Sequence, residues 1–289
     1  MPNEQATRGI RIYQCLALTI VCLYVISIGD ITMTHDQTSI KALKDLLYRM
    51  ADDALIIAHR NSEWTGLGPI LEEDIAFSSI AQDKIGHALA LYTLLQQLGE
   101  PEPDISAFTR NEKDYTCCHF VEYPIGGYDF SLMRHFLFDS AELLRYEMLE
   151  HSSYESLAKL STKVRGEIKY HVFHADTWIV QLGSQGNEES KSRMQSALNE
   201  CYPLALGIFE PSESEHILIE QKIFNGEQEL EKAWHERIQA ICDKAGLTIP
   251  SRETITPIYG GRKGFHSDHL QPLLEEMTEV FQIDPSAEW

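Results

Sequence analysis

Two segments of the sequence carry acidic and imidazole side chains at the spacing of an α-helix. Positions spaced by three and four share one helical face, and in the stretch 63–97 this face holds two acids and one imidazole. The segment 157–182 repeats the arrangement with one acid and two imidazoles. Burying such groups costs several kcal/mol unless they are paired or bound to a metal ion. The residues concerned are Glu73, Asp83, His87, Glu167, His171 and His174.

A carboxylate-bridged di-metal site is one chemistry that this pattern could support. Such a bundle needs an acid from each of two helices and a Glu-x-x-His pair from each of two others. Here Asp83 is followed three residues later by Gly86, and Glu167 by Tyr170, so both pairs lack their histidine. Each acid has an imidazole four residues on instead, which still lies on the same face, so weak metal binding stays an alternative.

We favour a second interpretation, in which these groups are the remnant of a metal site and form a buried polar network. Charge-assisted hydrogen bonds between the acids and the imidazoles would then satisfy each buried group. A third predicted helix, through 133–151, adds Glu147 at an inward position. The predicted network, with no catalytic residue and no metal in this chain, consists of Glu73, Asp83, His87, Glu147, Glu167, His171 and His174.

A glycine-rich turn near the C-terminus is the most basic point of the sequence. It places Arg262 and Lys263 between glycines. Glycines with two cations can hold a phosphate or a carboxylate, and the same cations could instead dock on acidic residues of a partner. We therefore predict that Arg262 and Lys263 protrude and contact a partner or a ligand.

The composition excludes several classes of partner. The chain has 289 residues with 24 basic and 44 acidic side chains, which gives a formal charge of −20. Binding to nucleic acid or to an anionic membrane needs a basic face, so neither is expected. The 6 cysteines form no CxxC motif, and adjacent Cys117 and Cys118 cannot staple distant segments. This use of cysteine is typical of a reducing, cytoplasmic chain with free thiols.

The elements that must position the candidate residues are helices. No segment alternates apolar and polar residues as a half-buried strand would, and an irregular crossover separates two helix pairs. The sequence therefore predicts an all-α four-helix bundle with additional C-terminal helices. Besides the segments above, helices are expected at 39–60, at 190–209, within 212–246 and near the C-terminus.

The N-terminus does not share this pattern. Residues 13–28 are apolar and resemble the core of a signal peptide or a short membrane anchor. Met33 stands just before a polar leader and the first amphipathic helix. We expect residues 1–32 to be a dispensable extension, or not part of the protein, and 33–289 to be a single helical domain.

Several blocks in this domain are long and specific. In order, between about residue 43 and the end, they read EWTGLGPILEEDIAFSSIAQDKIGHA, EIKYHVFHADTWIVQLG, FEP and YGGRKGFHSDHLQPLLEEM. These blocks resemble the C subunits of the ring-1,2-phenylacetyl-CoA epoxidases, which are multicomponent oxygenases of aerobic phenylacetate degradation. The resemblance implies a ferritin-like fold and a structural, non-catalytic role in the oxygenase complex.

The resemblance also implies the partners and cofactors of such a complex. A homologous catalytic subunit would hold a di-iron centre and bind the acyl-CoA, and a separate reductase would supply electrons from NADPH. Two rival interpretations stay open. One is a self-sufficient di-iron or di-manganese oxidoreductase, and the other is a free-standing ferritin-like scaffold. The histidines missing at Gly86 and Tyr170 favour the structural subunit.

Overall fold

The structure, a computed structural model, describes residues 36–284, and these fold into helices without a β-strand. Two helix hairpins make up its body, because α2 packs along α3 and α6 packs along α7. The bounds of these helices are α2 (Gln37–Ser62), α3 (Leu71–Gln97), α6 (Tyr128–Leu149) and α7 (Glu155–Val180). The predicted all-α, ferritin-like four-helix bundle is confirmed.

The hairpins form where the sequence pattern predicts them. On α2, Leu43, Leu47, Met50 and Ala54 are spaced for one face and are at most 6% exposed. Beyond the end of α3, Gly99 has a φ of +92°, a left-handed conformation that favours glycine and stops the helix. The crossover between the hairpins contains α4 (Pro103–Phe108), η1 (Glu112–Asp114) and α5 (His119–Glu122).

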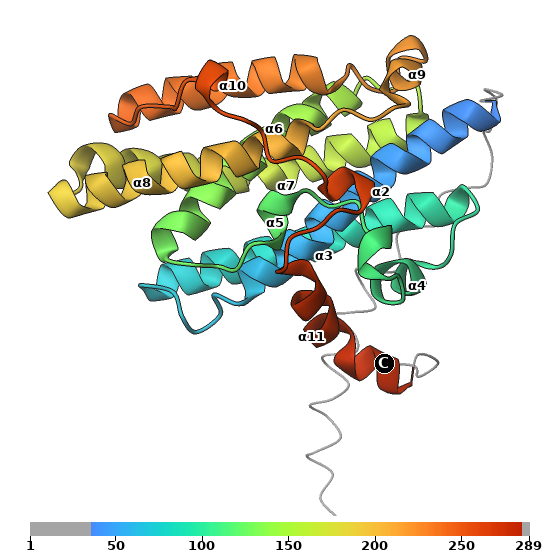
Figure 1. The fold of residues 1–289 in the computed structure, drawn as a ribbon, viewed down its shortest axis with the longest axis horizontal. Coiled ribbons are helices and arrows are strands. Elements are labelled where there is room, and N and C mark those ends of the chain that lie inside the picture. The colour runs from blue at the N-terminus through green and yellow to red at the C-terminus, as the bar shows by residue number, and fades with distance from the viewer. Residues whose placement is uncertain (1–35, 285–289) are drawn as a thin grey trace, which may run out of the picture. The chain divides into compact units, whose positions relative to one another are not determined.

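Two of the additional C-terminal helices, α8 and α10, cover one side of the bundle. Figure 1 shows α8 and α10 running alongside the long helices, and both pack against α6. Trp234 of α10 is fully buried, and its Nε1 donates to the carbonyl of Leu137 at 2.8 Å. The elements of this part are η2 (Gln181–Gln185), α8 (Glu188–Ala205), η3 (Leu206–Phe209), α9 (Glu215–Glu220), α10 (Glu227–Ala245), η4 (Arg252–Thr254), η5 (Gly261–Lys263) and α11 (Leu270–Ile283).

The expected N-terminal extension, residues 1–32, lies outside the described residues, so the domain boundary stays a prediction. None of the helices within 36–284 is both long and apolar enough to cross a membrane. The four cysteines of the described range are free and buried, namely Cys117, Cys118, Cys201 and Cys242.

Candidate functional site

Hydrogen bonds between carboxylates and imidazoles connect α3 to α7. Each bond joins one side chain of α3 to one of α7, so the two helices are held together by three polar contacts. The pairs are Glu73–His174 at 3.0 Å, Asp83–His171 at 3.0 Å and His87–Glu167 at 2.8 Å. The structure thus brings together six of the seven residues predicted for the polar network.

In two of these pairs, Asp83–His171 and His87–Glu167, the imidazole is buried more deeply than the acid. The side chain of His171 is 0% exposed, whereas those of Asp83 and Glu167 are 40% and 39% exposed. Burial lowers the pKa of both His87 and His171, although the acid bonded to each opposes this shift. The hydrogen bond from His171 holds the pKa of Asp83 below its ordinary value. A neutral imidazole therefore lies beneath an ionised Asp83 at neutral pH.

A buried lysine lies at the centre of the same region. The Nζ of Lys84 on α3 contacts Oδ1 of Asp139 and Oε2 of Glu142, both on α6. Lys84 is 0% exposed, and burial lowers its pKa, which the charge of Asp139 counteracts. Burial likewise opposes the ionisation of Asp139, but Lys84 and His135 hold the pKa of that carboxyl far below its usual range. The bundle core thus contains a fixed cation between two acids.

His135 links this ion cluster to the acid–imidazole pairs. Its Nδ1 lies against Oδ2 of Asp139, and its Nε2 is 3.2 Å from Nδ1 of His174. On the far side of His174, Glu73 accepts a hydrogen bond of 2.6 Å from the hydroxyl of Tyr128. A continuous chain of polar contacts therefore begins on α6 at Tyr128, passes through α3 and α7, and returns to α6 at His135 and Asp139. Such a network stabilises one arrangement of the three helices that contribute to it.

The part of this network that lies on α6 was not predicted from the sequence. His135, Asp139 and Glu142 are spaced by four and three, so they share one face, and this row could have been found by its spacing. Glu147 was predicted to face inward but lies in a different place. It follows Tyr146, the next member of the buried row, and one residue turns a side chain by about 100° around the helix axis.

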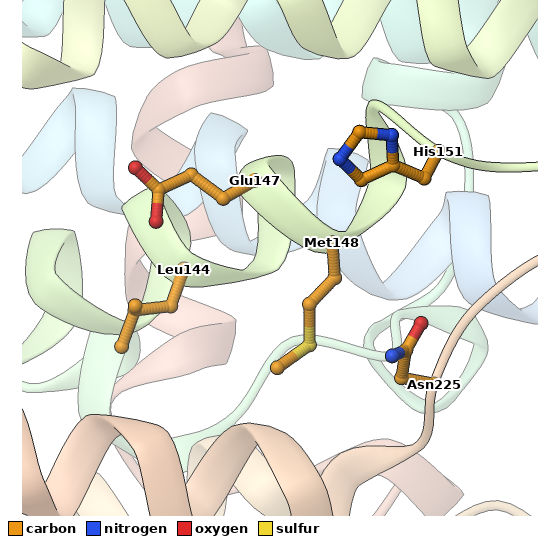
Figure 2. Close-up of a pocket in the computed structure, with 5 residues that line it drawn as sticks. All are labelled: Leu144, Glu147, Met148, His151 and Asn225. Atoms are coloured by element: carbon orange, nitrogen blue, oxygen red, sulfur yellow. The ribbon is translucent and has the colours of Figure 1, made fainter.

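Glu147 lies instead in a shallow surface pocket at the end of α6. Its Oε1 is 4.0 Å from Nη1 of Arg165, and its side chain is 40% exposed. The pocket has a volume of about 270 Å³ and a largely apolar lining (Figure 2). Its other lining residues are Leu144, Met148, His151 and Asn225.

The polar network does not fit a di-metal centre. The ammonium of Lys84 already occupies the space between Asp139 and Glu142, and it would repel a metal ion there. The Nδ1 atoms of His87 and His171 have no hydrogen-bond partner. These two nitrogens could each bind a metal ion, but a metal site needs several ligands. Within residues 36–284, no three possible ligand atoms of this network lie within 4.8 Å of one another. The geometry is that of paired acids and bases.

Arg262 does not protrude, contrary to the sequence-based prediction. Its side chain is 2% exposed, and its Nη2 lies 2.7 Å from Oδ2 of Asp53. An arginine side chain is long and flexible enough to reach from a surface turn into the core, where a buried acid can pair with its guanidinium. Lys263 next to it does extend outward, with a side chain that is 57% exposed and 3.9 Å from Glu210. Of the predicted contact pair, only Lys263 lies where a partner or ligand could reach it.

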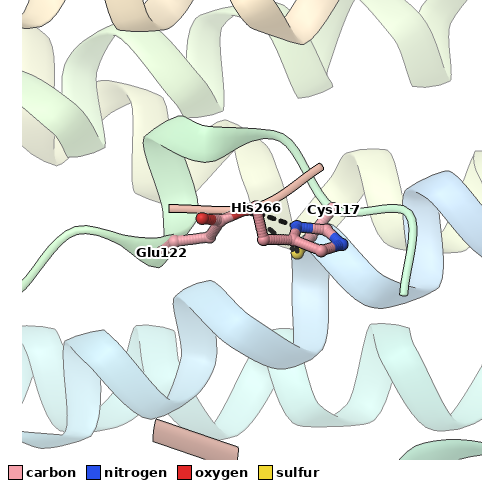
Figure 3. A group of neighbouring side chains, drawn as sticks. All are labelled: Cys117, Glu122 and His266. Carbon is pink, nitrogen blue, oxygen red and sulfur yellow. Dashed lines mark hydrogen bonds and ion pairs between the residues drawn. The ribbon is translucent and has the colours of Figure 1, made fainter. Parts of the chain in front are cut away.

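A second buried group lies outside the bundle core, at the base of α11. Among the residues from 36 to 284, only Cys117, Glu122 and His266 bring three possible metal-ligand atoms within 4.8 Å (Figure 3). The Nδ1 of His266 is 2.7 Å from Oε1 of Glu122, and its Nε2 is 3.0 Å from the carbonyl of Tyr115. Because both neighbours are acceptors, both ring nitrogens must carry a hydrogen, and the imidazole is cationic.

This arrangement favours a buried ion pair over a metal site. Glu122 also accepts hydrogen bonds from the backbone N–H and the hydroxyl of Ser267, at 2.8 and 2.6 Å. Burial raises the pKa of the Cys117 thiol well above its ordinary value. A metal ion would have to displace a proton from the thiol and another from His266. The pair anchors the segment before α11 to α5.

The Glu122–His266 pair predicts a pH dependence of stability. Burial opposes the charge on His266, but Glu122 raises the imidazole's pKa above 6.5. The stabilisation that the folded protein gains from the charged His266 is therefore complete below pH 6.5 and is lost as the pH rises through the raised pKa. Burial also opposes ionisation of Glu122, but His266 and Ser267 hold its pKa below 4.5, so that its contribution is lost only as the pH falls through that lowered pKa.

We therefore expect the loss of stability in His266→Gln to be largest near pH 5.5 and to shrink as the pH rises to about 9. Urea unfolding of the wild type and the variant across this range measures the difference. His235→Gln, at a half-buried histidine whose only described hydrogen bond is to a tyrosine hydroxyl, is the control. A loss that is the same at every pH would show that His266 is neutral.

Comparisons with known proteins place the chain in a family. A model of the family described as "Phenylacetic acid catabolic protein" matches residues 29–289. The chain is also similar to the C subunit of the 1,2-phenylacetyl-CoA epoxidase of Escherichia coli (strain K12). The two are 31% identical over 242 residues, which make up 83% of this chain and 96% of that protein. The extent of both matches shows that the chain belongs to the family of phenylacetic acid catabolic proteins.

Proposed function

We propose that this chain is a structural, non-catalytic subunit of a multicomponent acyl-CoA ring epoxidase, in which it stabilises a homologous catalytic subunit. Its similarity to the C subunit of the Escherichia coli phenylacetyl-CoA epoxidase supports this assignment. In the proposed complex the di-iron centre belongs to the catalytic subunit. Electrons come from NADPH through a separate reductase, and the complex works in the cytoplasm.

The position of Lys84 is the observation that carries the non-catalytic part of the proposal. A di-metal bundle uses acids from facing helices to bind two cations in its core. Here two acids of α6, Asp139 and Glu142, bind the ammonium of Lys84 on the neighbouring helix α3 instead. The side chain supplies a positive charge that, unlike a bound metal ion, cannot change its redox state or bind oxygen. The bundle then has its core charges balanced without a cofactor, which suits a subunit whose task is to fold and bind.

A self-sufficient di-iron or di-manganese oxidoreductase is the alternative. The unpartnered Nδ1 atoms of His87 and His171 favour it, because a buried imidazole nitrogen without a partner is a potential metal ligand. However, each of these imidazoles binds its own acid through Nε2. Burial and, to a smaller extent, the charge of Lys84 lower the pKa of both. The same positive charge disfavours a metal ion at their Nδ1 atoms.

Metal analysis and co-expression test the proposal together. After growth with added iron and manganese, the purified chain is expected to hold far less than one metal ion. The homologous catalytic subunit, purified in the same way, is the positive control. Co-expression of the two is expected to give a stable hetero-complex on size analysis. Stoichiometric metal that disappears in the variant Asp83→Asn/Glu167→Gln would instead establish the alternative.

A further inference from the structure

One side of the bundle carries exposed apolar side chains at helical spacing. The helix α8 packs against α6, α10 packs against α6 and α7, and α4 packs against α3, but α3 and α7 each keep one side exposed to solvent. We define the α3–α7 face by eight residues of these two helices, which are Leu71, Ile75, Ile85, Gly86, Leu89, Gly166, Tyr170 and Phe173.

The apolar members of this face are unusually exposed. The four aliphatic residues of α3 and the two aromatic residues of α7 are between 45% and 69% exposed. Together with Leu67 and Ile70, just before α3, they make up eight of the fifteen large apolar residues exposed in the described range. Single exposed apolar residues are ordinary, but such a gathering on one face marks an interaction surface.

Two glycines in the middle of this face point to close approach by another chain. Gly86 and Gly166 lie inside α3 and α7, where glycine is unfavourable compared with alanine. A Cβ added at either position would meet nothing within 4 Å, so no contact inside this chain requires a glycine there. Their chain neighbours His87 and Glu167 are hydrogen-bonded at 2.8 Å, which sets the two glycines at one level of the bundle. A partner helix could approach the backbone closely at that level.

The charge beside the glycines indicates what kind of partner fits. Asp83 and Glu167 lie at the seam between α3 and α7 with side chains that are 40% and 39% exposed. The imidazole bonded to Asp83 is buried and neutral, so the aspartate keeps its negative charge towards the outside. A partner should therefore present lysine or arginine here. A second copy of this chain would instead bring another molecule with a formal charge of −20.

We infer that the α3–α7 face docks a pair of helices from the homologous catalytic subunit, with an apolar ridge that lies over Gly86 and Gly166 and a cation that meets Asp83 and Glu167. This inference rests on the proposed function and names the surface through which the structural subunit acts. It also accounts for the two glycines, which otherwise only weaken the helices that contain them.

Binding of the two full-length subunits, with one of them immobilised, tests the inference. Gly86→Gln places a polar, helix-forming side chain at a position where an added Cβ meets no atom of this chain within 4 Å. We expect it to raise the melting temperature of the isolated chain by a few degrees and to weaken the complex by about tenfold or more. Phe173→Asp is expected to weaken the complex without lowering that melting temperature, because the ring is exposed. Val280→Asp, at an exposed valine of α11, is the matched control and should bind like the wild type.

The outcomes separate this inference from the proposed function. If the wild-type chains do not bind each other, both fail. If they bind and both variants bind equally well, the docking surface lies elsewhere and only the inference is overturned. The inference is also overturned if Phe173→Asp abolishes a homodimer of this chain but leaves the hetero-complex intact, because the occupant is then a second copy.

Discussion

Replacing Lys84 with methionine is expected to lower the free energy of unfolding by about 3–5 kcal/mol, because removing one partner of a buried ion pair leaves the other charge uncompensated. The ammonium is the counter-charge of two acids whose side chains are only 1% and 11% exposed, Asp139 and Glu142. Methionine has nearly the volume of the aliphatic part of lysine, so the expected loss in the free energy of unfolding comes from the missing charge and not from a cavity. Urea unfolding at neutral pH measures it as a shift of the midpoint at constant slope.

A compensated variant is the control for this prediction. Lys84→Met combined with Asp139→Asn and Glu142→Gln removes all three charges and keeps the shapes of the side chains. We expect it to recover much of the stability, since a buried ion cluster can often be replaced by neutral groups at little cost. If the single variant unfolds at the same urea concentration as the wild type, the ammonium does not hold the acids, and a metal centre between them is no longer disfavoured.

The helices and half of the polar network could be predicted from spacing alone. A single row of positions three and four apart finds Glu73, Asp83 and His87 on α3, because this row faces α7. This row does not include Lys84, because Lys84 directly follows Asp83 and therefore points to another side of α3. A helix packed on two sides buries a wider arc than one row, and a lysine beside an aspartate in the sequence usually indicates a solvated edge. Its partners on α6 are set by the packing of helices, which local spacing does not encode.

The error over Arg262 has a different physical origin. A glycine-rich basic turn on an acidic chain is ordinarily a surface feature, and nothing near it in the sequence indicates otherwise. Its partner Asp53 lies 209 residues earlier, on α2, in the middle of a helix predicted only from its apolar face. No local pattern connects two groups so far apart. The same limit applies to the Glu122–His266 pair, whose members are 144 residues apart.

The position of Arg262 reverses what a substitution there should do. A protruding arginine could be changed without loss of stability, but Arg262→Met is expected to lower the free energy of unfolding by about 3–5 kcal/mol. The change leaves Asp53 without its cation. It also removes the donor from the carbonyls of Thr116, Ile208 and Arg49, which lie 2.9, 3.2 and 3.3 Å from the guanidinium nitrogens. Thermal and urea unfolding of the isolated chain measure the loss.

Lys263→Met is the matched control, because the two cations are neighbours on one turn and differ in burial. The exposed Lys263 is expected to change stability by less than about 0.5 kcal/mol, as surface substitutions usually do. Equal effects of the two variants would contradict the buried position of Arg262. The contrast also matters for complex formation. Weakened assembly of Arg262→Met would reflect an unstable subunit, whereas any loss of binding in Lys263→Met would come from the surface itself, since the fold that presents it is unchanged.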